Sequence, residues 1–181
     1  MVMSASPTDG HFPGTGRYLQ QSKIQAALGH AQDLGASYAE VRLMAITDST
    51  VALRDGKLER AIPGQEIGVT MRILADGAWG VHSTTDVTSL PGQVESTVRL
   101  AKAVAARRAS KDRPVALAEV PIIESEEHWK PKKDVRNTDL DTKLHHLNTL
   151  YDSASEDDRI VSVTCGWHDE HLHTELITSE G

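Results

Sequence analysis

Two Asp-Gly dipeptides place the strongest limit on how this chain folds. Asp55-Gly56 and Asp76-Gly77 each separate two stretches that favour β-strands. Asp-Gly is typical of a tight two-residue turn in a β-hairpin. Apolar and polar residues alternate around the second turn, over residues 67–74 and 78–84. Short turns join antiparallel neighbours, so the sequence predicts a mostly antiparallel sheet of hairpins.

The same alternation predicts strands elsewhere in the chain. Pro63-Gly64 is expected to break the pattern, and Asp169-Glu170 is expected to turn the last two strands into a hairpin. The prediction is about seven strands. Besides the pair around Asp76-Gly77, they cover residues 39–43, 49–54, 57–62, 161–168 and 171–178.

Three helices are predicted from apolar residues at helical spacing. The first covers about residues 18–34 and ends at Gly35, as a glycine C-cap does. The second covers about 91–109, with Pro91 in its first turn. Its apolar stripe consists of Val94, Val98, Ala101 and Ala105. The third is capped by Asn137 or Thr138. Its apolar face consists of Leu140, Leu144, Leu147, Tyr151 and Ala154.

This order of elements, with strands grouped between helices, favours an α+β fold. Residues 1–16 are rich in Ser, Pro, Gly and Thr and are predicted to be a flexible tail. Residues 17–181 are expected to form one α+β domain. Within it, residues 110–136 are predicted to be a connection, with one short extended piece around Ile122.

The composition excludes several classes of function. The net charge of −7 argues against a dedicated nucleic-acid binder, because phosphate contacts need a basic surface. The 4% aromatic content argues against a stacking platform for single strands. No apolar stretch is long enough for a transmembrane helix, and the first residues do not resemble a signal peptide. The one cysteine, Cys165, fits a reducing compartment, so we expect a cytoplasmic protein.

A dense histidine cluster is the most visible candidate site. His168, His171 and His173 lie close together, with Asp169 and Glu170 between them. On a hairpin that turns at Asp169-Glu170, His168 would lie opposite His171 and share a face with His173. The three could then bind a transition metal. The preferred interpretation is a solvated edge hairpin, and no metal ligand is assigned. Its inward residues would be Val163, Cys165, Trp167, Leu172 and Leu176.

The other candidates have structural interpretations. His145-His146 point about 100° apart on a helix and cannot chelate one ion well. Cys165 has no activating neighbour and is interpreted as a buried structural thiol. The Gly64–Gly68 stretch is too loose to cradle phosphate, and no nucleotide-binding or nucleophile-elbow motif is present. A mild basic patch is interpreted as a solvated helix face; it contains Lys102, Arg107, Arg108, Lys111 and Arg113.

A series of short motifs resembles the N-terminal domain of the TldD/PmbA family, also described as modulators of DNA gyrase. The match covers roughly Tyr18 to Gly181, and the order and spacing of the motifs carry it. Thr70 and Thr178 depart from the family pattern without damaging a strand. The motifs are Ala39-Glu40-Val41-Arg42, Arg54-Asp55-Gly56-Lys57-Leu58-Glu59, Gly68-Val69-Thr70-Met71-Arg72-Ile73-Leu74, Asp76-Gly77-Ala78-Trp79-Gly80, His82-Ser83-Thr84 and Ile177-Thr178-Ser179-Glu180-Gly181.

The resemblance implies a cytosolic zinc-dependent metallopeptidase or its non-catalytic partner subunit, working in homo- or hetero-oligomers on peptides or unfolded proteins. It also implies an H-E-x-x-x-H helix beyond the Ser-Glu-Gly turn. His168, Asp169 and His173 imitate that spacing, but they precede the turn and are not assigned this role. We therefore expect a chain cut before its zinc-binding half, with no catalytic residue, no cofactor of its own and no activity alone.

The expected contribution of the chain is structural. Its sheet would form a wall of a peptide-binding cleft, and an exposed edge would pair with an extended peptide. Residues 67–74 and 78–84 would be the scaffold, with Trp79 in the core. Two alternatives remain: a stand-alone binding or assembly module without a peptidase half, and a small surface metal-binding protein that uses His168, His171 and His173.

Overall fold

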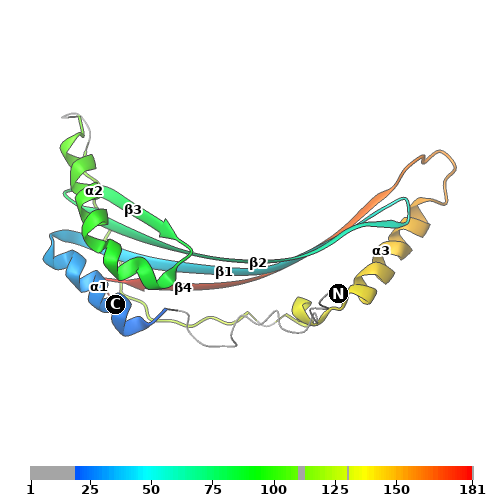
Figure 1. Ribbon diagram of the computed structural model, residues 1–181, viewed down its shortest axis with the longest axis horizontal. Coiled ribbons are helices and arrows are strands. Elements are labelled where there is room, and N and C mark those ends of the chain that lie inside the picture. Colours follow the sequence, from blue (N-terminus) through cyan, green and yellow to red (C-terminus); the bar gives the residue numbers. More distant parts are fainter. Residues whose placement is uncertain (1–18, 110–112, 130, 181) are drawn as a thin grey trace, which may run out of the picture. The chain divides into compact units, whose positions relative to one another are not determined.

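The computed structural model describes residues 19–109, 113–129 and 131–180 (Figure 1). The predicted 1–16 tail lies outside these residues. Three α-helices and one antiparallel sheet, with strand order β3-β2-β1-β4, confirm the α+β class. The described elements are α1 (Gln21–Asp33), β1 (Ala36–Arg54), β2 (Lys57–Ala75), β3 (Ala78–Thr84), the 3-10 helix η1 (Val87–Gln93), α2 (Val94–Ala106), the 3-10 helix η2 (Val135–Asn137), α3 (Leu140–Ala154) and β4 (Thr164–Thr178).

Both Asp-Gly turns form as predicted. Asp55 and Gly56 have φ angles of 49° and 71°, and Asp76 and Gly77 have 52° and 71°. Two successive residues with positive φ are what a two-residue hairpin turn of the type I′ class requires. Beyond the second turn, β2 and β3 pair from Ala75↔Ala78 to Val69↔Thr84.

The strands are fewer and longer than the sequence predicts. β1 joins the two stretches predicted at 39–43 and 49–54, and β2 continues through Pro63-Gly64. Among the described pairings, β3 covers β2 only over residues 69–75. The first half of β2 therefore lies at the edge of the sheet on that side. A proline is tolerated at a sheet edge, where its missing N–H breaks no ladder bond.

The predicted hairpin at the end of the chain is wrong, because Thr164–Thr178 form one uninterrupted strand, β4. Among the described non-glycine residues, positive φ occurs only at Asp55 and Asp76. Asp169 and Glu170 thus lack the left-handed backbone that a two-residue turn needs. The side chain of Asp169 is instead held in the strand by Ser49, Lys143 and Trp167.

The helix ends differ from the predictions in detail. Gly35 follows α1 with φ of 93°, so it acts as the predicted C-terminal glycine. Pro91 lies inside η1 rather than in the first turn of α2. The N-cap of α3 is Asp139, whose carboxylate accepts from the Thr142 N–H at 2.7 Å. Ile122 lies in irregular backbone of the connection, where no strand is assigned.

The chain divides into two compact units, each with its own core. Unit 1 comprises residues 1–44, 67–125 and 174–181, and unit 2 comprises 45–66 and 126–173. Helices α1 and α2 supply the buried core of unit 1 together with the inner residues of the strands, and α3 does so in unit 2. No helix in the described part of the chain has both the length and the apolar character needed to cross a bilayer.

Candidate functional site

The β2–β3 hairpin of unit 1 has two different faces. Ile73 pairs with Gly80, and α2 packs against this side, where Gly80 lies beside Thr97 and Ala101. The flanking pairs Arg72↔Val81 and Leu74↔Trp79 point to the opposite side because side chains alternate along a strand. Arg72 and Trp79 therefore lie together on the face of the hairpin that α2 leaves uncovered.

Four side chains from three strands form a connected group on this face, here called the Arg72 cluster: Tyr38, Glu40, Arg72 and Trp79. An Nη1 of Arg72 lies 3.1 Å from Oε1 of Glu40, and the guanidinium carbon lies 4.3 Å from the centre of the Trp79 ring. The Tyr38 hydroxyl donates to Oε2 of Glu40 at 2.9 Å. The Tyr38 and Trp79 rings meet edge to face, with centroids 6.1 Å apart.

In the Arg72 cluster, Glu40 and Tyr38 are paired with each other, whereas Arg72 keeps donors for a ligand. Glu40 is only 8% exposed, and both of its carboxylate oxygens have a partner. Burial, followed by the hydrogen bond to Glu40, raises the pKa of Tyr38 to about 12, so the phenol stays a neutral donor. The Arg72 side chain remains 42% exposed. Its guanidinium carries five donors, so it keeps donors for a ligand beyond the bond to Glu40.

The end of the described chain completes this site. The backbone N–H of Ser179 donates to the Ala39 carbonyl at 2.8 Å, and the Ser179 hydroxyl accepts from the Ala39 N–H at 3.0 Å. These bonds bring Glu180 beside β1. Glu180, the Arg72 cluster and the connection line a cavity of about 210 Å³. The connection contributes Leu117, Ala118 and Val120.

Motif segments that lie far apart in the sequence thus meet in one place. Glu40, Arg72, Trp79 and Glu180 each belong to a different motif. Residues 39–107 match the family model described as PmbA/TldA metallopeptidase domain 1. The resemblance to the TldD/PmbA family is confirmed. The matched region includes Glu40, Arg72 and Trp79 but not Glu180.

Solved structures show the same fold. A candidate modulator of DNA gyrase from Bacteroides thetaiotaomicron aligns with a TM-score of 0.62 and 20% identity over 88% of this chain. A candidate modulator of a DNA gyrase from Thermotoga maritima gives 0.61 and 16%, and TldE from Thermococcus kodakarensis gives 0.60 and 16%, each over 88% of this chain. The chain spans 36%, 35% and 35% of these structures. No curated protein matches the chain.

The TldD/PmbA-type fold does not bring the three histidines of β4 together. Successive side chains along a strand point to opposite faces, so His168 lies on one face and His171 and His173 on the other. His168 contacts Thr50 through Nδ1 at 3.1 Å. The predicted convergence of these histidines is wrong, because it required a turn at Asp169-Glu170. Among the described residues, no group of three or more His, Cys, Asp or Glu side chains is placed to hold a metal ion.

Unit 2 instead contains a nearly buried ion pair. Nζ of Lys143 on α3 lies 2.7 Å from Oδ2 of Asp169 on β4, and the two side chains are 8% and 11% exposed. The same oxygen accepts from Nε1 of Trp167 at 2.6 Å and from Ser49 Oγ at 3.1 Å. Burial raises the pKa of Asp169, but these hydrogen bonds outweigh it, so the pKa lies below its ordinary value. The pair joins α3 to the sheet.

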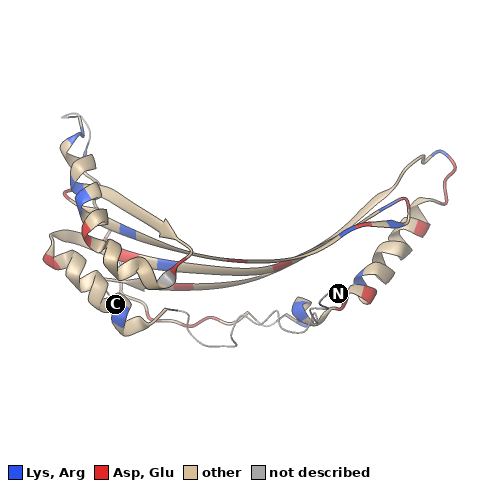
Figure 2. Ribbon diagram, viewed as in Figure 1, with Lys and Arg blue, Asp and Glu red and all other residues tan. Residues whose placement is uncertain are grey.

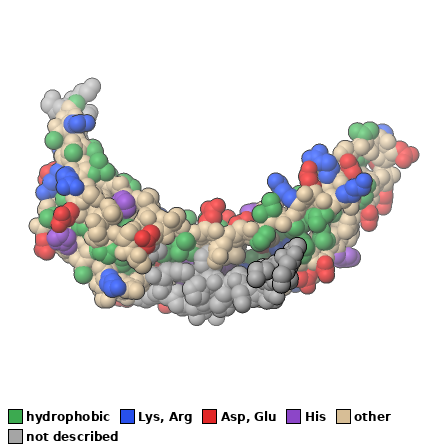
Figure 3. All heavy atoms as spheres, viewed as in Figure 1, with side chains coloured by type: hydrophobic (Ala, Val, Ile, Leu, Met, Phe, Trp, Pro, Cys, Tyr) green, Lys and Arg blue, Asp and Glu red, His purple; other side chains and the backbone are tan. Residues whose placement is uncertain are grey.

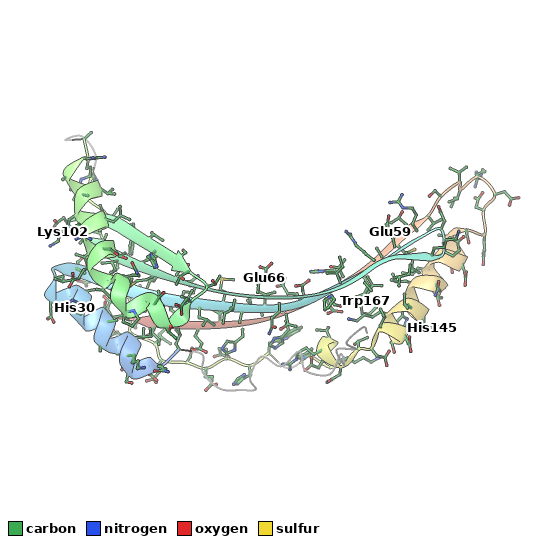
Figure 4. All side chains as sticks on the ribbon, in the orientation of Figure 1. His30, Glu59, Glu66, Lys102, His145 and Trp167 are labelled. Carbon is green, nitrogen blue, oxygen red and sulfur yellow. The ribbon has the colours of Figure 1, made fainter. Side chains whose placement is uncertain are left out.

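The aromatic and sulfur side chains of unit 2 support the same packing. The ring of His146 stacks on Trp167 with centroids 5.9 Å apart, and both His145 and His146 are exposed, as predicted for helix-surface residues (Figure 4). Cys165 is half-buried and packs against the Val51–Leu53–Leu147 core rather than being fully enclosed.

The basic patch separates into different environments. Nζ of Lys102 donates to the Leu34 carbonyl at 2.7 Å, at the end of α1. Arg107, Arg108 and Arg113 line one cavity of about 560 Å³ near the C-terminal end of α2. Figure 2 shows basic residues along α2. Lys111 lies outside the described residues. Arg107 and Arg113 are exposed, as a solvated face requires, whereas Arg108 is half-buried and donates to the carbonyls of Asp76 and Gly77.

Sequence reasoning missed Tyr38, Glu40, Arg72 and Glu180 as site residues. Trp79, expected in the core, is half-buried and lines both cavities. One signal was available. Glu40 and Arg42 alternate with apolar residues in β1, and this pattern alone predicts that both side chains face solvent. Glu40 also belongs to one of the motifs that carry the family resemblance, which was a reason to consider it as a site residue. A buried carboxylate needs a cation, and the fold supplies it from Arg72, which belongs to a later motif.

Proposed function

We propose that this chain contributes the first domain of a TldD/PmbA-type metallopeptidase, or of its non-catalytic partner subunit, and that its part is to bind peptides or unfolded proteins. The observation that supports this most directly is the match of residues 39–107 to the family model, because it contains the core of the Arg72 cluster. An oligomer with a related subunit and a cytoplasmic location belong to the same proposal.

Zinc is the metal that the resemblance implies, and the described residues do not fit it. They contain no suitable group of His, Cys, Asp or Glu side chains. The contribution proposed for them is therefore substrate binding, without any step at a metal.

The Arg72 cluster supplies suitable polar contacts for a peptide. The free donors of Arg72 can bind peptide carbonyl or carboxylate oxygens, and the carboxylate of Glu180 can accept from peptide N–H groups. The Trp79 ring fixes one face of the guanidinium, while Glu40 compensates its charge. An arginine held in this way loses less side-chain entropy on binding than a free one.

The outer strand β4 offers the second element of the proposal. Ser179 donates its backbone N–H to Ala39 and Val163 accepts from the Asp55 N–H, so the odd-numbered residues of this segment face β1. The even-numbered residues, such as Leu172, then direct their backbone groups to the outer edge. An extended peptide can add to such an edge as a further strand.

A proline scan at this edge tests the proposal. Leu172→Pro removes an outward N–H without removing a bond to β1, and Leu172→Ala is the matched control. We expect the proline variant to bind a capped, fluorescein-labelled, Val- and Thr-rich decapeptide on the order of 10-fold more weakly, which is the loss of about one to two hydrogen bonds. Fluorescence anisotropy measures the affinity, and circular dichroism checks the fold. Equal binding by wild type and a folded Leu172→Pro chain would exclude the β4 edge.

A further inference from the structure

The cavity at the C-terminal end of α2 is lined by three arginines. Its lining includes Arg107, Arg108 and Arg113 beside Trp79, Val104 and Val115, and none of the described residues that line it carries a carboxylate. Figure 3 shows basic side chains at the surface over α2. In a chain with a net charge of −7, three arginines that share one cavity, with no acidic residue among its described lining, mark a local reversal of charge.

Two features hold the walls of this cavity in place. The backbone N–H of Val115 donates to the Gly77 carbonyl at 2.8 Å, which fixes the connection across the β2–β3 turn. Nη1 of Arg108 donates to the carbonyls of Asp76 and Gly77 at 3.2 and 2.9 Å. A Cβ atom at Gly77 would lie 2.3 Å from Cβ of Pro114, so the connection packs tightly on the turn. Arg108 is thus a structural member of the cavity.

Arg107 and Arg113 are the members available to a ligand. In the part of the chain that the structure describes, no ion pair with a carboxylate involves either of them. Guanidinium groups bind carboxylates through two parallel hydrogen bonds, and the exposed side chains of Arg107 and Arg113 are accessible to such a ligand. A volume of about 560 Å³ lies in the range of ligand pockets and exceeds what a single small ion fills.

We infer that this cavity binds a carboxylate of the peptide substrate, either an acidic side chain or a free C-terminus, with adjoining apolar atoms against Val104 and Val115. The inference rests on the proposed function and adds a charge preference to it. Trp79 lines both this cavity and the one at the Arg72 cluster, so the two cavities are neighbours on the β2–β3 hairpin.

The experiment compares three peptides of one sequence by isothermal titration into the whole chain. The first is capped at both ends with a central Glu, the second is capped with a central Gln, and the third has the central Gln and a free C-terminal carboxylate. We expect the Glu peptide or the free-acid peptide to bind on the order of 10-fold more tightly than the capped Gln peptide, with the difference shrinking at high salt.

Substitutions test whether Arg107 and Arg113 cause the preference for a carboxylate. Arg107→Gln with Arg113→Gln should abolish the preference for the carboxylate, while Arg99→Gln, an exposed arginine of the same helix, should keep it. Equal affinity for all three peptides would overturn this inference and leave the proposed function intact. Absence of binding by all three at millimolar concentration would overturn both. A preference that survives the double variant would also overturn the assignment to this cavity.

Discussion

Gly80 on β3 lies directly against Thr97 on α2: a Cβ atom at Gly80 would meet the Thr97 carbonyl oxygen at 2.2 Å. The nitrogen of Ala101 would lie 3.0 Å away, so backbone atoms form the obstacle. A helix can approach a sheet this closely only where the strand carries no side chain. This contact sets the distance between α2 and the hairpin that presents Arg72 and Trp79 on its other face.

Gly80→Ala is therefore expected to destabilise the chain by about 1–3 kcal/mol, because the helix backbone must move. Gly68→Ala is the matched control, since a Cβ atom at Gly68 would meet nothing within 4 Å. Its free energy of unfolding should stay within about 1 kcal/mol of wild type. Urea denaturation with an unchanged slope measures both. Equal midpoints for the two variants would show that α2 does not pack as described.

Tyr38 should titrate at unusually high pH. Its pKa is raised from 10.0 to about 12, first by burial and then by the hydrogen bond to Glu40. Tyrosinate absorbance, taken as the difference between wild type and Tyr38→Phe, should show this. The unfolded chain loses this proton near pH 10 while the folded chain retains it, so stability falls as pH rises from 10 to about 12. In Glu40→Gln the pKa of Tyr38 should move back towards 10.0; no change would remove Glu40 as a cause.

Removing only one partner of the Lys143–Asp169 ion pair should lower the free energy of unfolding more than replacing both partners does. Lys143→Met leaves the Asp169 carboxylate nearly buried without its cation, which should cost about 3–5 kcal/mol. The double variant Lys143→Met with Asp169→Asn has no unpaired charge and should be more stable than Lys143→Met alone. Thermal unfolding measures both. A double variant less stable than the single one would contradict the described network.

Acid should weaken unit 2 through the same carboxyl group. The pKa of Asp169 lies below its ordinary value in the folded chain, so the unfolded chain takes up this proton first as the pH falls. Its contribution is therefore complete above about pH 4, the ordinary range of an aspartate, and is lost as the pH drops through the folded pKa. Asp169→Asn should flatten this part of the stability profile between pH 5 and pH 2, roughly the window of the shift. An unchanged profile would show that other carboxyl groups dominate.

The sequence predicted the two Asp-Gly hairpins of this fold because their determinants are local. An Asp-Gly turn needs only two residues with positive φ, and both turns occur as expected at Asp55-Gly56 and Asp76-Gly77. The ends of the strands were harder to predict from the sequence. Whether Pro63 breaks a strand depends on which side of β2 is paired. That information comes from the position of β3, which no local pattern contains.

The candidate site was largely beyond sequence reasoning for a similar reason. The histidines of β4 lie close together in sequence, but one uninterrupted strand directs His168 and His171 to opposite faces. Glu40 and Arg72 lie far apart in sequence, yet neighbouring strands bring them within 3.1 Å. In the sequence, the segments that contain Glu40 and Arg72 were related only because both are motifs of the family resemblance. The fold shows that these two motifs lie side by side.

We propose that the Arg72 cluster binds peptides, and isothermal titration of a capped extended peptide into the whole chain tests this. Arg42→Gln is the control, because Arg42 is an exposed arginine on β1 outside the cavity. We predict that wild type and Arg42→Gln bind equally, that Arg72→Gln binds on the order of 10-fold or more weakly, and that mass spectrometry recovers the peptide intact. Unchanged affinity in a folded Arg72→Gln chain, or cleavage of the peptide by the wild-type chain alone, would contradict the account.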